Sequence, residues 1–311
     1  MQKICILASG GDCPGMNACV EAIYKYAKAN GMNTVAAMNG FDGLVDDVFV
    51  NVTDTNATGI SHKSGCVFGC SRSPRIKEHQ GFKSAVSNIK KHGIDAMIVI
   101  GGNGSLVGAG RFKNAGINVT FIPGTIDNDV PGHKHSIGFS SACENSVKLI
   151  DTLKATMETS ERDHIVQLMG RHCNELTQRV GIATFADVID MEGARVTAQQ
   201  VANVFVQNRK AGKTSNFMIM QERKAENAVK ERLEDAKFLN EISRAAKSDN
   251  IRMSVLGYLQ RGASPSCHDR FLAVLYGKAA VECIAKKQCG MGVAFINDGL
   301  HLLNIELAPI P

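Results

Sequence analysis

The feature that most constrains the fold is a repeated pattern in which a short apolar run ends at a glycine-rich loop and a helix-like segment follows. Lys3 to Ala8 leads into "SGGDCPGMN" and then into the helix formers from Ala18 to Asn30. The pattern recurs, with "NTVAAM" before "NGFDGL", "DAMIVI" before "GGNGS" and "INVTFI" before "PGTIDND". Such alternation predicts a mostly parallel sheet covered on both faces, with the loops at the carboxyl ends of its strands lining one crevice.

The alternation restarts after about residue 140 with helix-like "SACENSVKLIDTLKATMETS" and the strands "HIVQLMG" and "NFMIMQE". We therefore predict an α/β fold of two three-layer domains with mostly parallel sheets, packed around an active cleft. The segments "IRMSVLGYLQRGASP" and "GVAFIND" read as strands that return to the first domain. The first domain would contain residues 1–139 and about 253–300, and the second 140–252 and about 301–311. One amphipathic helix is predicted from the spacing of Val229, Leu233, Ala236, Leu239 and Ile242.

Composition narrows the class of ligand. No apolar run approaches the roughly 18 residues that a membrane span needs, and the ten cysteines lack paired spacing, so we expect reduced thiols and a cytoplasmic protein. The net charge of +5 is spread along the chain and aromatic residues make up only 5%. This balance favours small anionic ligands over nucleic acid.

Two loops carry candidate chemistry. "ASGGDCPGMN" joins a strand to a helix, so its glycines and the helix N–H groups suit a phosphate, although it has neither the Walker ending nor the GxGxxG spacing. A plain strand-to-helix turn is the alternative. In "PGTIDND", Asp127 and Asp129 could divide the roles of general base and metal ligand, or could cap the next helix.

Arginines near loops are candidates for bidentate contacts with phosphate, although a lone surface arginine is usually a solvated charge. They are Arg72, Arg162, Arg171, Arg252 and Arg261.

Taken together, these motifs resemble a known family. "LASGGDCPGMN", "GCSRSP", "IGGNGS", "PGTIDND", "IGF", "MGR" and "LQRGASP" follow the order and nearly the spacing found in the ATP-dependent 6-phosphofructokinases, from residue 1 to about 300. The resemblance implies transfer of a phosphoryl group from MgATP to the 1-hydroxyl of fructose 6-phosphate, a step of glycolysis. It also implies a cytoplasmic homotetramer whose active sites are shared between subunits, with no nucleic-acid or membrane partner.

The resemblance also assigns roles to residues on the nucleotide and reacting side. Asp127 is similar to the catalytic base and Asp129 to part of the magnesium site, which Asn103 would share. The implied catalytic set is Asp127, Gly11, Arg72, Thr125 and Arg171. The implied nucleotide contacts are Gly11, Phe41, Arg72, Ser73, Gly102, Asn103, Gly104 and Ser105.

On the sugar-phosphate side, the resemblance implies that Arg162 and Arg252 reach into a neighbouring subunit's site, while Arg261 acts within its own chain. The implied substrate contacts are Thr125, Asp127, Asp129, Arg162, Met169, Gly170, Arg171, Glu222, Arg252, Tyr258 and Arg261. Pyrophosphate-dependent relatives carry aspartate at the position of Gly104 and lysine at that of Gly124, so these two glycines favour ATP as the donor.

Several positions depart from the family pattern. Asn103 replaces an aspartate, which predicts a raised magnesium requirement, and Tyr258 replaces a histidine that contacts the 6-phosphate. The positions of the family's effector pocket hold Glu21, Lys25 and Asp54, which predicts weak or absent control by ADP and phosphoenolpyruvate. These departures support one alternative, a catalytically weak or silent homologue that binds nucleotide or sugar phosphate as a regulatory subunit. A pyrophosphate-dependent enzyme is the other alternative.

Overall fold

The computed structural model describes residues 2–170, 173–223, 227–288 and 290–305. It divides into two compact units, Met1–Ser141 with Arg261–Pro311 and Ala142–Gln260, and the boundary falls within helix α6 (Phe139–Ser160). Each unit is an α/β structure built on a mostly parallel sheet, so the predicted fold class is confirmed.

The sheet of the first unit has the strand order β13-β12-β6-β5-β1-β2-β3, with β4 paired to β1 and β7 to β6. Its strands pair in parallel except at the two edges, where β3 and β13 are antiparallel to their neighbours. The strands are β1 (Lys3–Ser9), β2 (Asn33–Ala37), β3 (Phe49–Asn51), β4 (Cys70–Ser71), β5 (Ala96–Gly101), β6 (Asn118–Thr125), β7 (Ile137–Gly138), β12 (Met291–Ile296) and β13 (Gly299–Asn304).

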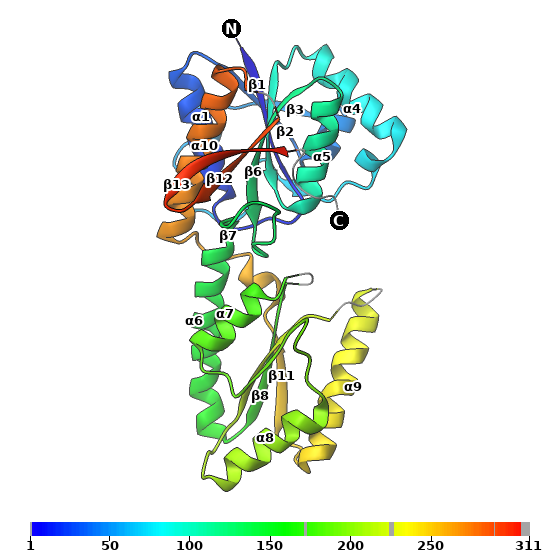
Figure 1. Cartoon of the computed structure of the whole chain (residues 1–311), viewed down its shortest axis with the longest axis vertical. Helices are drawn as coiled ribbons and strands as arrows, with labels where there is room; N and C mark the ends of the chain where they lie inside the picture. Colours follow the sequence, from blue (N-terminus) through cyan, green and yellow to red (C-terminus); the bar gives the residue numbers. More distant parts are fainter. Residues whose placement is uncertain (1, 171–172, 224–226, 289, 306–311) are drawn as a thin grey trace. The chain divides into compact units, whose positions relative to one another are not determined.

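Helices cover both faces of this sheet. Helices α1 and α10 lie side by side on one face (Figure 1), in close contact because Gly277 of α10 has no side chain where it meets Ala22 of α1. Helices α4 and α5 cover the other face, where Ile89 and Phe112 are buried against Met97 and Val99 of β5. The helices are α1 (Met16–Ala29), α2 (Phe41–Val45), α3 (Asp54–Ala57), η1 (Arg75–Lys77), α4 (His79–Lys91), α5 (Asn103–Asn114) and α10 (Cys267–Ala285).

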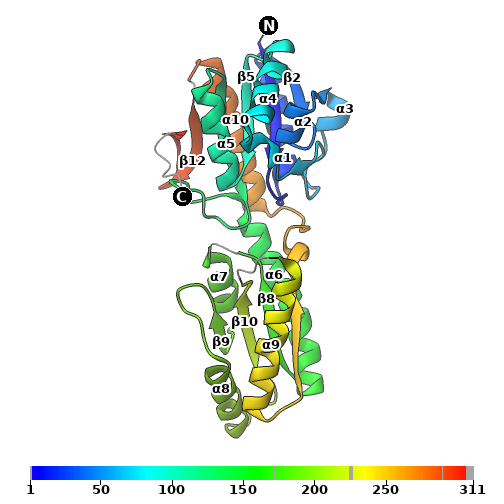
Figure 2. The ribbon, with the colours of Figure 1, turned by 90° about the vertical axis from the view of Figure 1, so that its right-hand side faces the viewer.

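The second unit has a smaller sheet in which the order β11-β8-β10-β9 is parallel throughout. Helices α8 and α9 bury Phe205, Phe238 and Ile242 against it, and α6 and α7 lie on the opposite face (Figures 1 and 2). Its elements after α6 are β8 (Asp163–Leu168), α7 (Glu175–Ala183), β9 (Val188–Asp190), α8 (Ala198–Lys210), β10 (Phe217–Gln221), α9 (Ala228–Ala246), β11 (Ile251–Val255) and η2 (Gly257–Gln260).

The predicted domain boundaries need correction at two places. The segment 253–260, expected in the first domain, belongs to the second unit because β11 pairs with β8. Of the segment 301–311, expected in the second domain, the described part belongs to the first unit because β13 pairs with β12. Local sequence can indicate a strand, but strand pairing decides which sheet receives it.

The amphipathic helix is present as α9, but its buried face differs from the predicted one. Val229 and Leu233 are exposed, whereas Phe238 and Ile242 are buried. The buried face also includes Asp235, which accepts a hydrogen bond of 2.8 Å from Gln167. Because a polar residue with a partner occupies that face, hydrophobic spacing alone assigned the first half of the helix to the wrong side.

The nine cysteines in the described part of the chain are all free thiols, as predicted. Among the helices described here, none is both long and apolar enough to cross a membrane.

Candidate active site

The candidate loops of the first unit gather at one edge of its sheet. β1 lies between β2 and β5, and β6 is the next parallel neighbour of β5. Because the carboxyl ends of parallel strands meet at the same edge, the loops that follow β1, β5 and β6 are adjacent. The short strand β4 pairs with the last residues of β1, which adds the "GCSRSP" segment to the same edge. The convergence of the glycine loops is therefore confirmed.

The loop after β1 contains a glycine in the left-handed conformation and accepts hydrogen bonds from an arginine side chain. Gly10 has φ +93° and donates its N–H to Ser71 O at 2.9 Å. The Arg261 side chain donates from Nε to Asp12 O at 3.0 Å and from Nη2 to the Asp12 carboxylate. A Cβ on Gly11 would lie 2.8 Å from Arg261 Nη2, so the missing side chain leaves room for the guanidinium in this position. Gly11 and Arg261, both predicted site residues, are thus brought together.

Arg72 is exposed and stands between two serines that fix its backbone. The hydroxyls of Ser71 and Ser73 each donate a 2.6 Å hydrogen bond to the Asp42 carboxylate. The guanidinium is therefore presented from a fixed loop at the edge where β1 ends. Asp42 was not predicted as a site residue, and its role depends on partners about 30 residues away in the chain.

The acidic loop after β6 is held in place by an asparagine. Asn128 has φ +55°, donates to Lys134 O at 3.0 Å and accepts from Ser136 N at 2.8 Å. Thr125 Oγ1 accepts a 3.2 Å hydrogen bond from the Asp127 N–H. These contacts fix the backbone on both sides of Asp127 and Asp129. Asn128 was not predicted as a site residue. Because asparagine tolerates the left-handed conformation, its place in this loop is consistent with a turn.

The predicted metal residues meet directly. Asn103, at the start of α5, donates from Nδ2 to Asp129 Oδ2 at 2.7 Å. Its other amide atom, Oδ1, is buried and accepts no hydrogen bond from any described residue. A buried oxygen without a partner beside a carboxylate is a donor set that suits Mg²⁺, which binds through one or two protein oxygens plus phosphates and water. The described residues contain no cluster of three acidic, histidine or cysteine side chains that could hold a metal by itself.

The predicted nucleotide residues differ in accessibility. A Cβ on Gly104 would meet no atom within 4 Å, so this position faces open space. A Cβ on Gly124 would lie 2.9 Å from Ile100 Cγ2. Ser105 is buried and donates to Ser9 O at 3.1 Å, which ties the loop after β5 to the end of β1. Gly102 lies beside Thr125, with 3.5 Å between its Cβ position and Thr125 Cβ.

Phe41 requires a correction. The resemblance implies a contact with nucleotide, but the Phe41 side chain is only 2% exposed and stacks on Phe112 at a ring distance of 5.8 Å. It also fills the space beside Gly108, where a Cβ would lie 2.7 Å from the ring. The Phe41 ring is therefore a core residue in this structure.

The second unit places three predicted sugar-phosphate residues at the carboxyl edge of its sheet. Met169 and Gly170 follow β8, and Glu222 follows β10 and donates its N–H to Leu168 O at 2.8 Å. Tyr258, in η2, has a side chain that is 75% exposed. Arg171 lies outside the described residues.

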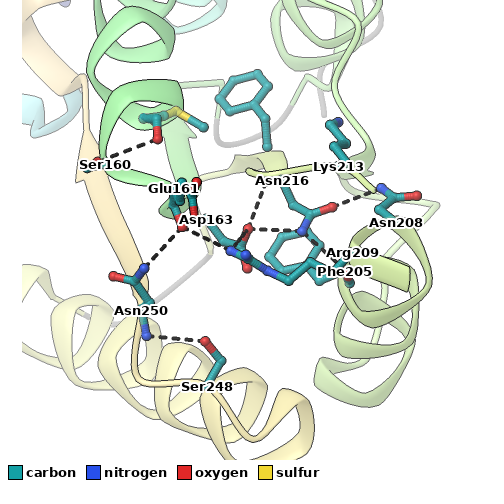
Figure 3. Close-up of polar contacts among 12 residues, drawn as sticks. Ser160, Glu161, Asp163, Phe205, Asn208, Arg209, Lys213, Asn216, Ser248 and Asn250 are labelled. Atoms are coloured by element: carbon teal, nitrogen blue, oxygen red, sulfur yellow. Dashed lines mark hydrogen bonds and ion pairs between the residues drawn. The ribbon is translucent and has the colours of Figure 1, made fainter. Parts of the chain in front are cut away.

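Arg162 and Arg252 lie at the other end of that sheet. Arg162 immediately precedes β8, and Arg252 is aligned with His164 in the parallel β8–β11 pair. At about 3.3 Å per strand residue, the length of β8 separates Arg162 from Met169 by about 20 Å. Figure 3 shows the hydrogen bonds that stabilise this end of the sheet. The Asp163 carboxylate accepts from Arg209 at 3.0 Å and from the Asn216 N–H at 2.7 Å. The Asn250 side chain donates to Glu161 O at 3.0 Å.

This architecture, with glycine loops, paired acids and arginines at the carboxyl edge of a parallel sheet, defines an α/β protein that handles phosphorylated ligands. Residues 3–284 match the family model described as phosphofructokinase. The chain belongs to the phosphofructokinase family.

Relatives resemble the chain over nearly its full length. It is 36% identical over 309 residues to an ATP-dependent 6-phosphofructokinase of Sulfurihydrogenibium sp. (strain YO3AOP1), covering 99% of this chain and 94% of the relative. It is 35% identical over 297 residues to the ATP-dependent 6-phosphofructokinase of Lactobacillus delbrueckii subsp. bulgaricus, covering 96% and 90%. Among solved structures, phosphofructokinase from Saccharomyces cerevisiae matches with a TM-score of 0.87 at 28% identity, covering 99% of this chain and 45% of that chain.

Proposed function

We propose that this protein transfers the γ-phosphoryl group of ATP to the 1-hydroxyl of fructose 6-phosphate, which yields fructose 1,6-bisphosphate and ADP in glycolysis. The observation that carries the proposal is the position of the Thr125–Asp129 loop, at the same sheet edge as the glycine loop of β1 and in contact with Asn103. This arrangement offers a base, N–H donors for phosphate and a partial metal site in one place. Relatives named ATP-dependent 6-phosphofructokinase, which match this chain over 90% or more of their own length, support the same activity.

The chemistry assigns one task to each residue. Asp127 takes the proton of the sugar 1-hydroxyl as that oxygen attacks the γ-phosphorus, and the Thr125 hydroxyl fixes the loop on which Asp127 lies. The Gly11 N–H holds the transferring group, because a glycine loop allows the backbone to approach phosphate. Arg72 and Arg171 offset the charge of the transferring phosphoryl group.

Magnesium would be held by Asp129 and by the unpartnered Oδ1 of Asn103. Bound Mg²⁺ would neutralise charge on the β- and γ-phosphates of the nucleotide. Because Asn103 is neutral, Asp129 is the single carboxylate of this pair, and the phosphates must supply the remaining negative charge.

The open space at Gly104 supports ATP rather than pyrophosphate as the donor. Gly102, Asn103, Gly104 and Ser105 form the first turn of α5 with its preceding loop, where helix N–H groups favour an anion. Ser73 belongs to the neighbouring Arg72 loop and accepts an N–H bond from Ile76 at 3.3 Å.

The sugar phosphate would contact Met169, Gly170 and Glu222 of the second unit and Arg261 of the first. Tyr258 replaces a histidine of the family and offers one hydroxyl donor, but it cannot become cationic. The arginines would therefore supply the positive charge that binds the 6-phosphate.

We further propose a homotetramer with shared active sites. Arg162 and Arg252 lie at the end of the small sheet opposite Met169 and Gly170. Since one phosphate cannot be reached from both ends of β8, these arginines would serve the site of a neighbouring subunit. Sedimentation at enzyme concentrations used for assay would test the tetramer. A cytoplasmic location, in keeping with free thiols, is part of the same proposal.

A coupled assay with ATP, magnesium and fructose 6-phosphate tests the proposed activity. We expect formation of fructose 1,6-bisphosphate that requires all three components and is lost when pyrophosphate replaces ATP. The silent-homologue alternative predicts ligand binding without ADP release, and the pyrophosphate alternative predicts turnover with that donor.

A further inference from the structure

The loop that follows β8 is held by the side chains of two glutamines. Gln260 Oε1 accepts a 2.8 Å hydrogen bond from the Met169 N–H, and Gln221 Nε2 donates to the Gly170 carbonyl. Both glutamine side chains are fully buried. The backbone of Met169 and Gly170 is therefore fixed by one acceptor and one donor that come from distant parts of the chain.

Gln221 connects more than one loop. Its Nε2 also donates to Cys173 O at 3.1 Å, and its Oε1 accepts from the Glu192 N–H at 2.6 Å. The Gln221 backbone carbonyl accepts from Arg195 at 3.2 Å. One amide group thus joins the loop after β8 to the loop after β9, at the end of the strand that leads directly to Glu222.

The loop conformation fixed in this way is one that only glycine adopts readily. Gly170 has φ +120°, and a Cβ there would lie 2.7 Å from Cys173 O. The Gly170 and Cys173 carbonyls both accept from the same buried amide, and the Gly170 carbonyl also accepts from the Cys173 N–H at 3.1 Å. Removal of the amide would therefore break two buried hydrogen bonds that tie this backbone to β10. The backbone at Gly170 would then shift from this position.

We propose that Gln221 is a positioning residue for the sugar-phosphate site, acting through the backbone of Gly170. This inference rests on the proposed function, because Met169, Gly170 and Glu222 are sugar-phosphate contacts only if the protein is a phosphofructokinase in activity. Gln221 itself is fully buried and does not touch substrate. Its contribution is to the affinity for the sugar phosphate, with little effect on ATP.

The chain offers a matched control in Gln167. This glutamine lies on the adjacent strand β8, where it is aligned with Met220, the residue before Gln221. It is 3% exposed and donates from Nε2 to Asp235 Oδ2 at 2.8 Å, toward helix α9 and away from the loops. Loss of its amide therefore removes a buried hydrogen bond between β8 and α9 but leaves the hydrogen bonds to Gly170 in place.

The experiment compares Gln221→Leu with Gln167→Leu in the full chain. A coupled assay measures kcat and the KM values for fructose 6-phosphate and ATP. Calorimetry measures the dissociation constant for fructose 6-phosphate, and thermal unfolding shows whether each variant is folded. We expect Gln221→Leu to raise the KM and dissociation constant for the sugar phosphate by about tenfold, as the loss of two buried hydrogen bonds to this backbone predicts. We expect Gln167→Leu to lower the unfolding temperature similarly but to change these constants by less than about twofold.

Equal sugar-phosphate constants for the two variants would overturn the inference, as would an equal rise in the KM for ATP. If Gln221→Leu does not fold, Gln221→Met keeps the length of the side chain without its donor, and the same comparison applies. A wild-type protein that neither binds nor phosphorylates fructose 6-phosphate would instead overturn the proposed function.

Discussion

Asn103 Nδ2 donates a 2.7 Å hydrogen bond to Asp129 Oδ2, across the gap between the loops that follow β5 and β6. An amide and a carboxylate attract each other at this distance, whereas two carboxylates would repel unless a cation lay between them. The hydrogen bond therefore joins the two side chains directly, and the pair contains one carboxylate where the family pattern has two.

The Asn103→Asp variant is expected to need less magnesium. The added carboxylate gives the hard cation a second charged ligand, and we expect half-maximal activity at a Mg²⁺ concentration lower by about tenfold. Without Mg²⁺ the same variant should unfold at a lower temperature than the wild type, because the two acids then repel. Magnesium titrations of activity and of thermal unfolding measure both effects, with Asn30→Asp on the exposed end of α1 as the control. An unchanged titration would remove Asn103 from the metal site.

Gly104→Asp is expected to fold but to lose activity with ATP. The Cβ position is open, and an acid in the first turn of α5 should leave the unfolding free energy unchanged or raise it by up to about 1 kcal/mol. A carboxylate beside the nucleotide phosphates should lower kcat/KM for ATP on the order of 100-fold. Gly110→Asp, on the same helix with its Cβ position 3.5 Å from Ile305, adds the same charge away from the loop. Equal ATP kinetics in both variants would contradict the placement of the phosphates.

Activity is expected to respond weakly or not at all to ADP and phosphoenolpyruvate as effectors. Glu21 accepts the N–H groups of Gly59, Ile60 and Ser61 at 3.1, 3.0 and 2.9 Å and pairs with Lys25 at 2.5 Å. Burial alone would raise the pKa of Glu21, but the hydrogen bonds from Lys25 and the backbone outweigh it and lower the pKa. The donors are thus already occupied by an ionised acid.

The family resemblance also assigns Lys154 and Lys213 to effector positions, and both side chains have partners within the second unit. Lys213 pairs with Asp187 at 2.5 Å, and Lys154 donates to Thr184 O. Initial rates at subsaturating fructose 6-phosphate, with and without each effector, measure the response. A strong ADP activation that survives replacement of Lys213 would contradict this account.

Asp269→Asn is expected to change how stability depends on pH. Asp269 is fully buried and accepts the N–H of Ser141 at 2.7 Å. Burial raises the pKa of Asp269, and the hydrogen bonds from Ser141 only partly oppose it. The folded protein therefore holds this proton to a higher pH than the unfolded chain does, and the corresponding stability is lost as pH rises through the raised pKa.

The unfolding free energy of Asp269→Asn minus that of the wild type should therefore increase between pH 4 and pH 8. Urea unfolding of both proteins across this range gives the difference. A difference that stays constant with pH would show that the carboxyl group does not titrate in this way.

The parts of the fold that follow from local sequence were predictable. Each glycine loop directly follows the strand that positions it, so the loops after β1, β5 and β6 could be placed at one edge before the structure was known. The sheet that receives β11 or β13 depends instead on pairing between distant segments. For the same reason the burial of Phe41, which results from packing against Phe112, was not visible in the motif "NGFDGL".

The candidate site shows the same division. Residues that would touch substrate lie in short motifs, and the family resemblance identifies them. The residues that hold those motifs in place do not lie within them and could not be predicted, because their partners are distant in the sequence. Gln221 and Gly170 are 51 residues apart, and Asp42 lies 29 residues from Ser71. Gln221 stands out in the sequence only as a polar residue at the end of an apolar strand. That position does not indicate which groups its side chain contacts.

The most direct test of the account is the turnover of Asp127→Ala, measured with saturating ATP, magnesium and fructose 6-phosphate. Removal of the base should lower kcat by about 100- to 10,000-fold, while circular dichroism and thermal unfolding remain close to those of the wild type. Sugar phosphorylation at an undiminished rate in the folded variant would contradict the assignment of Asp127 and the mechanism built on it.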